Sequence, residues 1–152
     1  MKLPKNRYKL FFIFAIAALL LNFIMSTVAE NAVSEALNPL LQKETLDLIE
    51  IFVYMVIMTP FFETVIFQVL PIELFQKIKW SKMFTIVICA IIFAMAHAWD
   101  YGFVYALLVI PMGLLFAVYY VVLRERGRVL AILSVSLIHG ILNLVSFFIN
   151  FY

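Results

Sequence analysis

The chain has 152 residues, of which 66% are hydrophobic and 13% are charged, and its mean hydropathy is +1.11. A soluble domain is about half apolar and about a quarter charged, so this composition excludes a soluble globular protein. At about 20 apolar residues per spanning helix there is room for about five helices, and none for a separate soluble domain. The small net charge of +2 gives no sign of a nucleic-acid partner, and the single cysteine, Cys89, excludes an internal disulfide.

We therefore expect one integral membrane domain over residues 1–152, an all-α bundle of about five transmembrane helices. A basic start, residues 1–9, leads into a first apolar run over residues 10–28. That run is long for a signal peptide, although residues 27–29 could form a cleavage site, and we favour an uncleaved span. Further spans are predicted at about residues 48–70, 83–98, 103–123 and 129–149, and Pro60 predicts a kink or break within the second of them.

The basic residues alternate between loops and so predict the orientation. Ten of the eleven Lys and Arg residues lie in the N-terminal segment, in the loop at residues 71–82 and in the turn at residues 124–128. The intervening loops hold only Lys43. Cytoplasmic loops carry the excess of Lys and Arg, so we expect a multi-pass protein of the cell membrane with its N-terminus in the cytoplasm.

A few polar side chains interrupt the apolar spans: Glu63, His97, His139 and Asn143. A charged group at the centre of a membrane helix costs roughly 2.5–3.5 kcal/mol or more, and lipid offers no hydrogen-bond partners, so these side chains should turn inward. By contrast, Glu73 lies near a predicted span boundary and should be solvated.

If these side chains turn toward one another, the set can perform chemistry. A carboxylate or an imidazole can take a proton from water, and a second imidazole and an amide can donate to an oxyanion. Glu63, His97 and His139 would also make a zinc ligand set. The alternatives are polar contacts that only join helices, or a proton path across the membrane.

The order of motifs resembles the CAAX protease and bacteriocin-processing (CPBP, or Abi) family, which includes the type II CAAX prenyl endopeptidases. That family has Glu-Glu-x-x-x-Arg, then Phe-x-x-x-His, then His-x-x-x-Asn or Asp, each on a membrane helix. Phe93 and His97 match the second motif, and His139 and Asn143 match the third. The resemblance covers about residues 46–149.

The first motif departs from the family pattern. Aligned on Pro60 and Phe67, Glu63 takes the first Glu position, while Thr64 replaces the second Glu and Gln68 replaces the Arg. The two replaced residues would lie four apart on one helix face, where they could pair as ions. Changing both avoids an unpaired charge in the membrane, and we expect Thr64 and Gln68 to keep a hydrogen bond.

The resemblance implies an intramembrane endopeptidase in which Glu63 activates water with help from His97. His139 and Asn143 would stabilise the oxyanion of the peptide bond, with Thr64, Gln68 and Phe93 in support. The family has been described both as metalloproteases and as metal-independent glutamic proteases. We expect no cofactor, because Asn143 resembles an oxyanion donor more than a ligand, with zinc held by Glu63, His97 and His139 as the alternative. The partners that the resemblance implies are the lipid bilayer and a peptide or membrane-protein substrate, prenylated or bacteriocin-like. A non-catalytic bacteriocin-immunity or membrane scaffold protein of the same family is the alternative function.

One geometrical difficulty accompanies this interpretation. If each span is straight and centred in the membrane, Glu63 lies near the midplane but His97 lies about six residues from the centre of its own span. At 1.5 Å per residue that is a mismatch of about 9 Å, which tilt, the Pro60 kink or a shifted third span would have to remove.

Overall fold

The structure, a computed structural model, describes residues 6–41 and 47–151, and these ranges contain helices and no β-strand. The elements in chain order are α1 (Arg7–Leu41), α2 (Leu48–Phe52), η1 (Val53–Met58), α3 (Thr59–Glu63), η2 (Thr64–Val69), α4 (Leu70–Lys77), α5 (Lys82–Arg124) and α6 (Arg128–Phe151).

The predicted all-α membrane bundle is confirmed. Within the described residues, four helical stretches are long and apolar enough to cross a membrane: Tyr8–Thr27, Leu48–Lys77, Gly102–Arg124 and Arg128–Ile149. A shorter apolar helix, Lys82–Ala98, takes the place of the third predicted span. It is joined to the fourth at Gly102, where φ is +83° and the helix direction breaks, because glycine adopts this conformation without steric cost.

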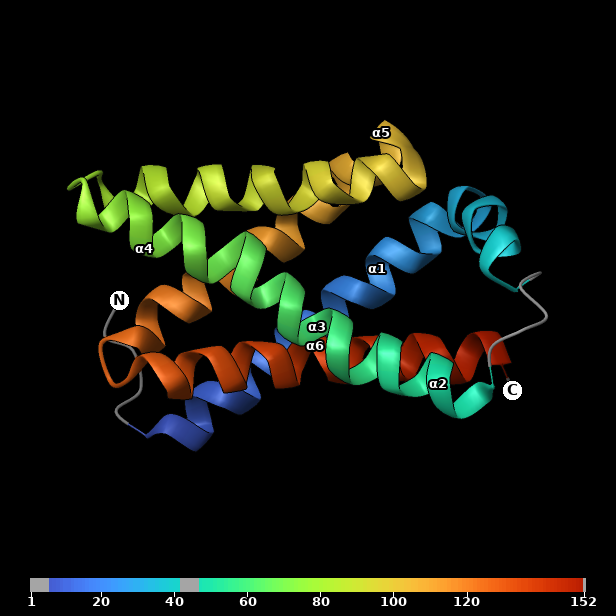
Figure 1. Ribbon diagram of the computed structural model, residues 1–152, viewed down its shortest axis with the longest axis horizontal. Helices are drawn as coiled ribbons and strands as arrows, with labels where there is room; N and C mark the ends of the chain where they lie inside the picture. Colours follow the sequence, from blue (N-terminus) through green and yellow to red (C-terminus); the bar gives the residue numbers. More distant parts are fainter. Residues whose placement is uncertain (1–5, 42–46, 152) are drawn as a thin grey trace.

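The basic segments of the described chain lie at one end of the bundle. In Figure 1 the start of α1, the turn from α4 to α5 and the turn from α5 to α6 all lie at the left-hand end. These are the basic segments of the sequence. The bend within α5 and the end of α6 lie at the other end of the molecule, so the described basic segments share one end of the bundle.

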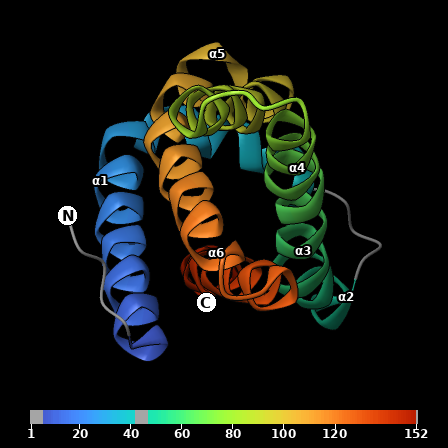
Figure 2. The same cartoon turned by 90° about the vertical axis from the view of Figure 1, so that its left-hand side faces the viewer.

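The second half of α5, Gly102–Arg124, is the central helix of the bundle. In Figure 2 it runs between α1 on one side and the rod formed by α2, α3 and α4 on the other. Its side chains Phe116, Tyr119 and Tyr120 are fully buried. Gly113 allows the two halves of α5 to approach closely, because a Cβ there would lie only 3.0 Å from the Cα of Ala90.

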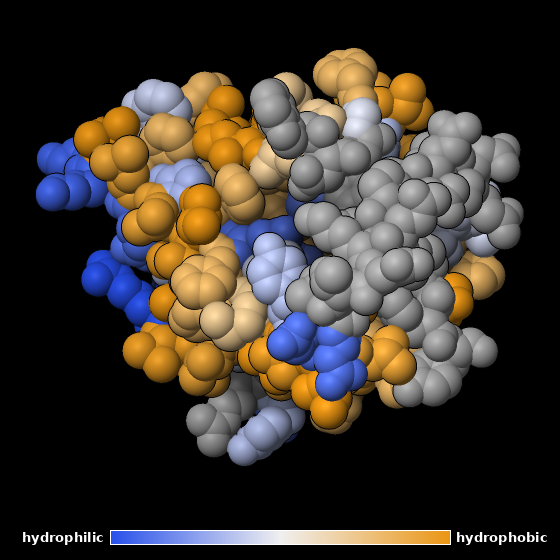
Figure 3. Space-filling model, turned by 45° about the vertical axis from the view of Figure 1, so that its right-hand side comes forward, coloured by the Kyte–Doolittle hydropathy of each residue, from blue (hydrophilic) through white to orange (hydrophobic). Residues whose placement is uncertain are grey.

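The outer surface is apolar, as a lipid-facing surface should be. Large side chains such as Phe23 (68% exposed) and Tyr54 (68%) point outward, and Figure 3 shows apolar side chains over much of the described part of one face. These groups would be costly to expose to water, whereas lipid tails solvate them without penalty.

The rod Leu48–Lys77 alternates between α- and π-helix, and its prolines explain the pattern. Each π segment ends two residues before a proline, Pro60 or Pro71. Proline has no N–H and its ring clashes with the carbonyl four residues earlier, so wider turns before it relieve the clash. The predicted disturbance at Pro60 is therefore a change of helical register, and Figure 1 shows the rod changing direction between α2 and α4.

Candidate active site

Glu63 lies between the two histidines of the chain. Its Oε2 atom is 3.5 Å from Nε2 of His139 and 4.0 Å from Nε2 of His97. Three helices contribute one side chain each: α3 provides Glu63, the first half of α5 provides His97, and α6 provides His139. The site is not sealed, because the side chains of Glu63 and His97 keep 23% and 16% of their surface exposed while that of His139 keeps 8%.

The expected depth mismatch between Glu63 and His97 is wrong. The two helices are antiparallel and joined by the short turn at residues 78–81, so positions at equal distance from this turn lie at the same level. Glu63 is 14 residues before Lys77 and His97 is 15 residues after Lys82. Centring each span in the membrane concealed this relation, because the Lys82–Ala98 helix is much shorter than its neighbour.

The backbone holds the ring of His97 in a defined orientation. Its Nδ1 atom lies 2.9 Å from the carbonyl oxygen of Phe93, one turn earlier on α5. A carbonyl only accepts, so Nδ1 carries a hydrogen and Nε2 is the ring nitrogen that faces Glu63. A proton or a water hydrogen between this nitrogen and the carboxylate would bind to both.

The ring of Phe93 forms one wall of the site. Its centroid lies 4.6 Å from the ring of His97, 5.9 Å from that of His139 and 5.9 Å from that of Phe116. This apolar ring therefore lies against both imidazoles.

Two residues of the second half of α5 border the site and were missed by sequence reasoning. Phe116 lies 5.1 Å, centroid to centroid, from the ring of His139, and Tyr105 lies 6.3 Å from that of His97. The sequence gives no signal for Phe116 because aromatic residues are common throughout these spans. Tyr105 is a polar ring within an apolar run, and its hydroxyl could have identified it as a candidate.

Asn143 is engaged with the helix rod. Its Nδ2 donates to the carbonyl oxygen of Met55 at 2.9 Å. At the end of η1 the backbone bonds span five residues, as in Thr59 N–H to the Tyr54 carbonyl. The next donor in this register would be Pro60, which has no N–H, so the Met55 carbonyl needs a partner and Asn143 supplies it.

The family model of type II CAAX prenyl endopeptidase Rce1-like proteins matches residues 45–145, about two thirds of the chain. The chain belongs to this Rce1-like family. No curated protein and no solved structure matches it. The match begins just before the helix rod and includes Glu63, His97, His139 and Asn143, so the family assignment covers the whole candidate site.

The Rce1-like chain carries Thr64 and Gln68 where the family pattern has Glu and Arg, and the hydrogen bond expected between Thr64 and Gln68 is not formed. Both side chains are buried, at 1% and 0% exposure, and neither the Thr64 hydroxyl nor either amide atom of Gln68 has a partner in the described residues. Thr64 and Gln68 face the interior from the wide turns of η2. Buried polar groups without a protein partner are commonly hydrogen-bonded to buried water.

The arrangement of the acids and histidines also bears on metal binding. Among the residues that the structure describes, no three His, Cys, Asp or Glu side chains are arranged to hold a metal ion. The Nδ1 atom of His139 is buried without a hydrogen-bond partner, whereas zinc-ligating histidines usually have the second ring nitrogen bonded to a carbonyl or carboxylate. The mechanism proposed below accordingly uses no metal.

Two residues near the ends of α4 and α5 complete the comparison. Ser81 caps α5, since its Oγ accepts from the backbone N–H of Phe84 at 3.2 Å. The expectation that Glu73 is solvated is wrong, because its carboxylate contacts Tyr120, Arg124 and Arg128.

Proposed function

We propose that this Rce1-like protein is an intramembrane endopeptidase of the cell membrane that hydrolyses a peptide bond with water activated by Glu63. The observation that carries the proposal is the position of Glu63 Oε2, within 3.5 and 4.0 Å of two imidazole Nε2 atoms. A carboxylate flanked by two imidazoles, in an apolar and partly open site, suits proton transfer from water.

In the first step a water molecule lies beside Glu63 and is oriented by the Nε2 lone pair of His97. One O–H bond breaks, its proton passes to the Glu63 carboxylate, and the oxygen forms a bond to the carbonyl carbon of the substrate. The carbonyl π electrons move to the carbonyl oxygen and leave a tetrahedral oxyanion. General-base assistance of this kind contributes typically 10²- to 10⁴-fold in rate.

In the second step the oxyanion collapses, the C–N bond breaks, and the leaving nitrogen takes the proton that Glu63 received. The products are a carboxylic acid and an amine, and Glu63 regains its charge. The chain supplies the acid and base for both steps, so no metal is needed in this scheme.

His139 and Asn143 are the proposed oxyanion donors. Neutral His139 that places its hydrogen on Nε2 can donate into the site, and the apolar rings around it strengthen such a hydrogen bond. For Asn143 one N–H is already used by the Met55 carbonyl, which leaves the second N–H for the substrate. We therefore assign the larger share of oxyanion stabilisation to His139.

The substrate is a peptide or a membrane-protein segment that enters the bilayer, with CAAX-type peptides as the first class to test. Cleavage is measured in reconstituted membranes with a fluorogenic farnesylated CAAX peptide, its unprenylated counterpart and a bacteriocin-leader peptide. We expect wild type to cleave at least one, and Glu63→Gln and His139→Ala to lose most of that rate. A chelator should leave the wild-type rate unchanged, and equal rates in all three proteins would refute the proposal.

The second candidate is a non-catalytic immunity or scaffold protein, and two observations favour it. Asn143 has a structural partner in Met55, and the Thr64 and Gln68 positions lack the charged groups of the family pattern. Under this alternative, Glu63→Gln would preserve function in a bacteriocin-survival assay, whereas the protease requires the carboxylate.

A further inference from the structure

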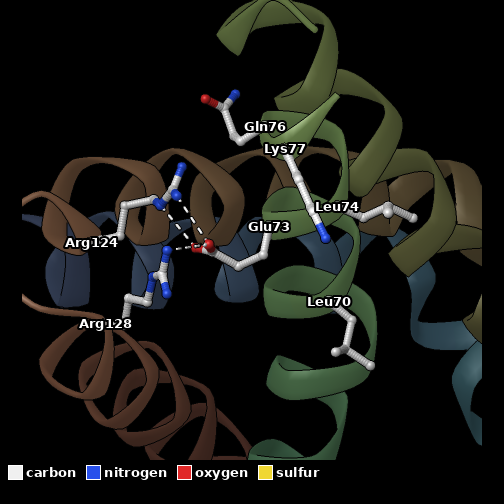
Figure 4. A pocket seen from close by; sticks show the side chains of 7 residues that line it. All are labelled: Leu70, Glu73, Leu74, Gln76, Lys77, Arg124 and Arg128. Atoms are coloured by element: carbon white, nitrogen blue, oxygen red, sulfur yellow. Dashed lines mark hydrogen bonds and ion pairs between the residues drawn. The ribbon is translucent and has the colours of Figure 1, made fainter. Parts of the chain in front are cut away.

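A cavity lies at the end of the bundle where the basic segments gather, away from Glu63. It has a volume of about 650 Å³ and lies between α4, the end of α5 and the start of α6 (Figure 4). Its polar lining comes from Glu73, Gln76, Lys77, Arg124 and Arg128, and its apolar lining from Leu70 and Leu74.

Glu73 organises the two arginines of this cavity. Its Oε1 atom lies 2.9 Å from Nε of Arg124 and accepts from the Tyr120 hydroxyl at 3.0 Å. Its Oε2 atom accepts from a second nitrogen of Arg124 at 3.0 Å and lies 3.2 Å from a terminal nitrogen of Arg128. Figure 4 shows the carboxylate pointing from α4 to both guanidinium groups. One carboxylate thus fixes two guanidinium groups that belong to different helices.

The cavity keeps positive charge and donors beyond those that Glu73 uses. Three cationic side chains, Lys77, Arg124 and Arg128, line it together with a single carboxylate. Each guanidinium has five N–H donors, and Glu73 takes only part of them, so the others remain available in a fixed orientation. Lys77 has no ion pair within the described residues and adds a third cation.

The apolar lining indicates that the ligand is amphipathic. Leu70 and Leu74 lie on α4 beside the cations and are 59% and 57% exposed. Trp80, stacked on Phe75 with ring centroids 4.5 Å apart, follows directly in the turn to α5. Tryptophan marks the level of lipid headgroups, so the cavity lies where a headgroup meets its acyl chains.

We propose that this cavity binds the phosphate group of an anionic phospholipid, with its acyl chains along Leu70 and Leu74. Bidentate arginine donors match phosphate oxygens, and basic clefts between membrane helices on the cytoplasmic side suit anionic headgroups. A bound phosphate would bridge α4, α5 and α6, whose ends enclose the cavity, and so stabilise the bundle at the base of the Glu63-bearing rod.

The test is thermal unfolding of the purified protein in a neutral detergent, with phosphatidylglycerol or phosphatidylcholine added at equal concentrations. A ligand that binds only the folded state raises the Tm. We expect phosphatidylglycerol to raise it and phosphatidylcholine to leave it unchanged. Equal shifts with the two lipids would overturn the proposal.

Matched variants locate the binding. Lys77→Gln and Arg128→Gln each remove one cation from an exposed position of the cavity, and Lys79→Gln removes the same charge from the nearby turn outside it. At about 1 kcal/mol per basic residue near a membrane surface, the first two should weaken the apparent affinity for phosphatidylglycerol about fivefold. Lys79→Gln should match wild type, and an equal loss in all three variants would contradict a defined site.

Two further arms separate other sources of the negative charge. Inorganic phosphate at the same concentration should give no shift, because it lacks acyl chains, and a full shift would assign the cavity to a free anion. A short peptide with a free C-terminal carboxylate should not displace phosphatidylglycerol. Displacement by this peptide but not by its amide would assign the cavity to a substrate end and overturn the lipid proposal. None of these measurements depends on protease activity.

Discussion

The hydrogen bond from Asn143 to Met55 can be tested by a double-mutant cycle with Pro60. Asn143→Ala removes the donor and leaves the Met55 carbonyl without a partner in the membrane. Pro60→Ala restores a backbone N–H, so the rod can satisfy that carbonyl itself in either helical register. We therefore expect the cost of Asn143→Ala to depend on which residue occupies position 60.

The magnitude follows from interhelical hydrogen bonds in membranes, which average about 0.6 kcal/mol in measured cycles and reach about 1.7. The Met55 carbonyl has no other donor in its helix because of Pro60, so the upper half of this range applies. We expect Asn143→Ala to cost about 1–1.5 kcal/mol alone, and less than half as much in the Pro60→Ala background.

Reversible unfolding in mixed micelles of a neutral detergent and dodecyl sulfate gives the four free energies of the cycle. A coupling energy near zero would refute the explanation of why Asn143 lies where it does. Cleavage rates of the same four proteins separate the two roles of Asn143. If its side chain is an oxyanion donor, Asn143→Ala lowers the rate in both backgrounds. If it is only a structural contact, Pro60→Ala restores the rate.

Other positions give further predictions. Gly140→Ala should lower the free energy of unfolding by about 1–3 kcal/mol in the same micelle assay, because the added Cβ would lie 2.7 Å from a backbone oxygen of η1. An unchanged free energy of unfolding would show that the two helices can move apart freely. Thr64→Glu should cost about 3 kcal/mol or more as a buried unpaired charge, and adding Gln68→Arg should recover most of it; failure of the double variant to exceed the single one would reject the ion-pair interpretation. Lys82 lowers the pKa of Glu125 through a hydrogen bond, so the stabilisation from this exposed pair is present above the ordinary pKa of a glutamate. It is lost as the pH falls through the lowered pKa, so the Tm difference between wild type and Lys82→Gln should shrink at low pH and high salt; a constant difference would contradict this.

The fold was largely predictable because a lipid environment restricts the choices. Apolar length predicted the spans, and the alternation of basic loops predicted which ends share a face of the bundle. The Gly102 break was expected only as the gap between the spans at residues 83–98 and 103–123. A gap of four residues does not indicate whether two helices separate fully or bend within one continuous element.

The candidate site was predictable in its members and less so in its geometry. Motif order identified Glu63 and the two histidines. Glu63 and His97 lie at the same depth because the turn after α4 is short, and the assumption that each span is centred in the membrane ignores this turn. The partner of Asn143 could not be foreseen, because it arises from the π register that precedes Pro60. The ion cluster of Glu73 was missed because its arginine partners lie about 50 residues away in sequence.

The central claim is that the Glu63 carboxylate activates water, and one rate comparison tests it most directly. Peptide cleavage is measured in reconstituted membranes for wild type, Glu63→Gln and the control Glu50→Gln, which makes the same chemical change at an exposed position of the same rod. The account predicts a loss of about 10²-fold or more for Glu63→Gln and a wild-type rate for Glu50→Gln. A Glu63→Gln protein that folds and cleaves as fast as the control would contradict it.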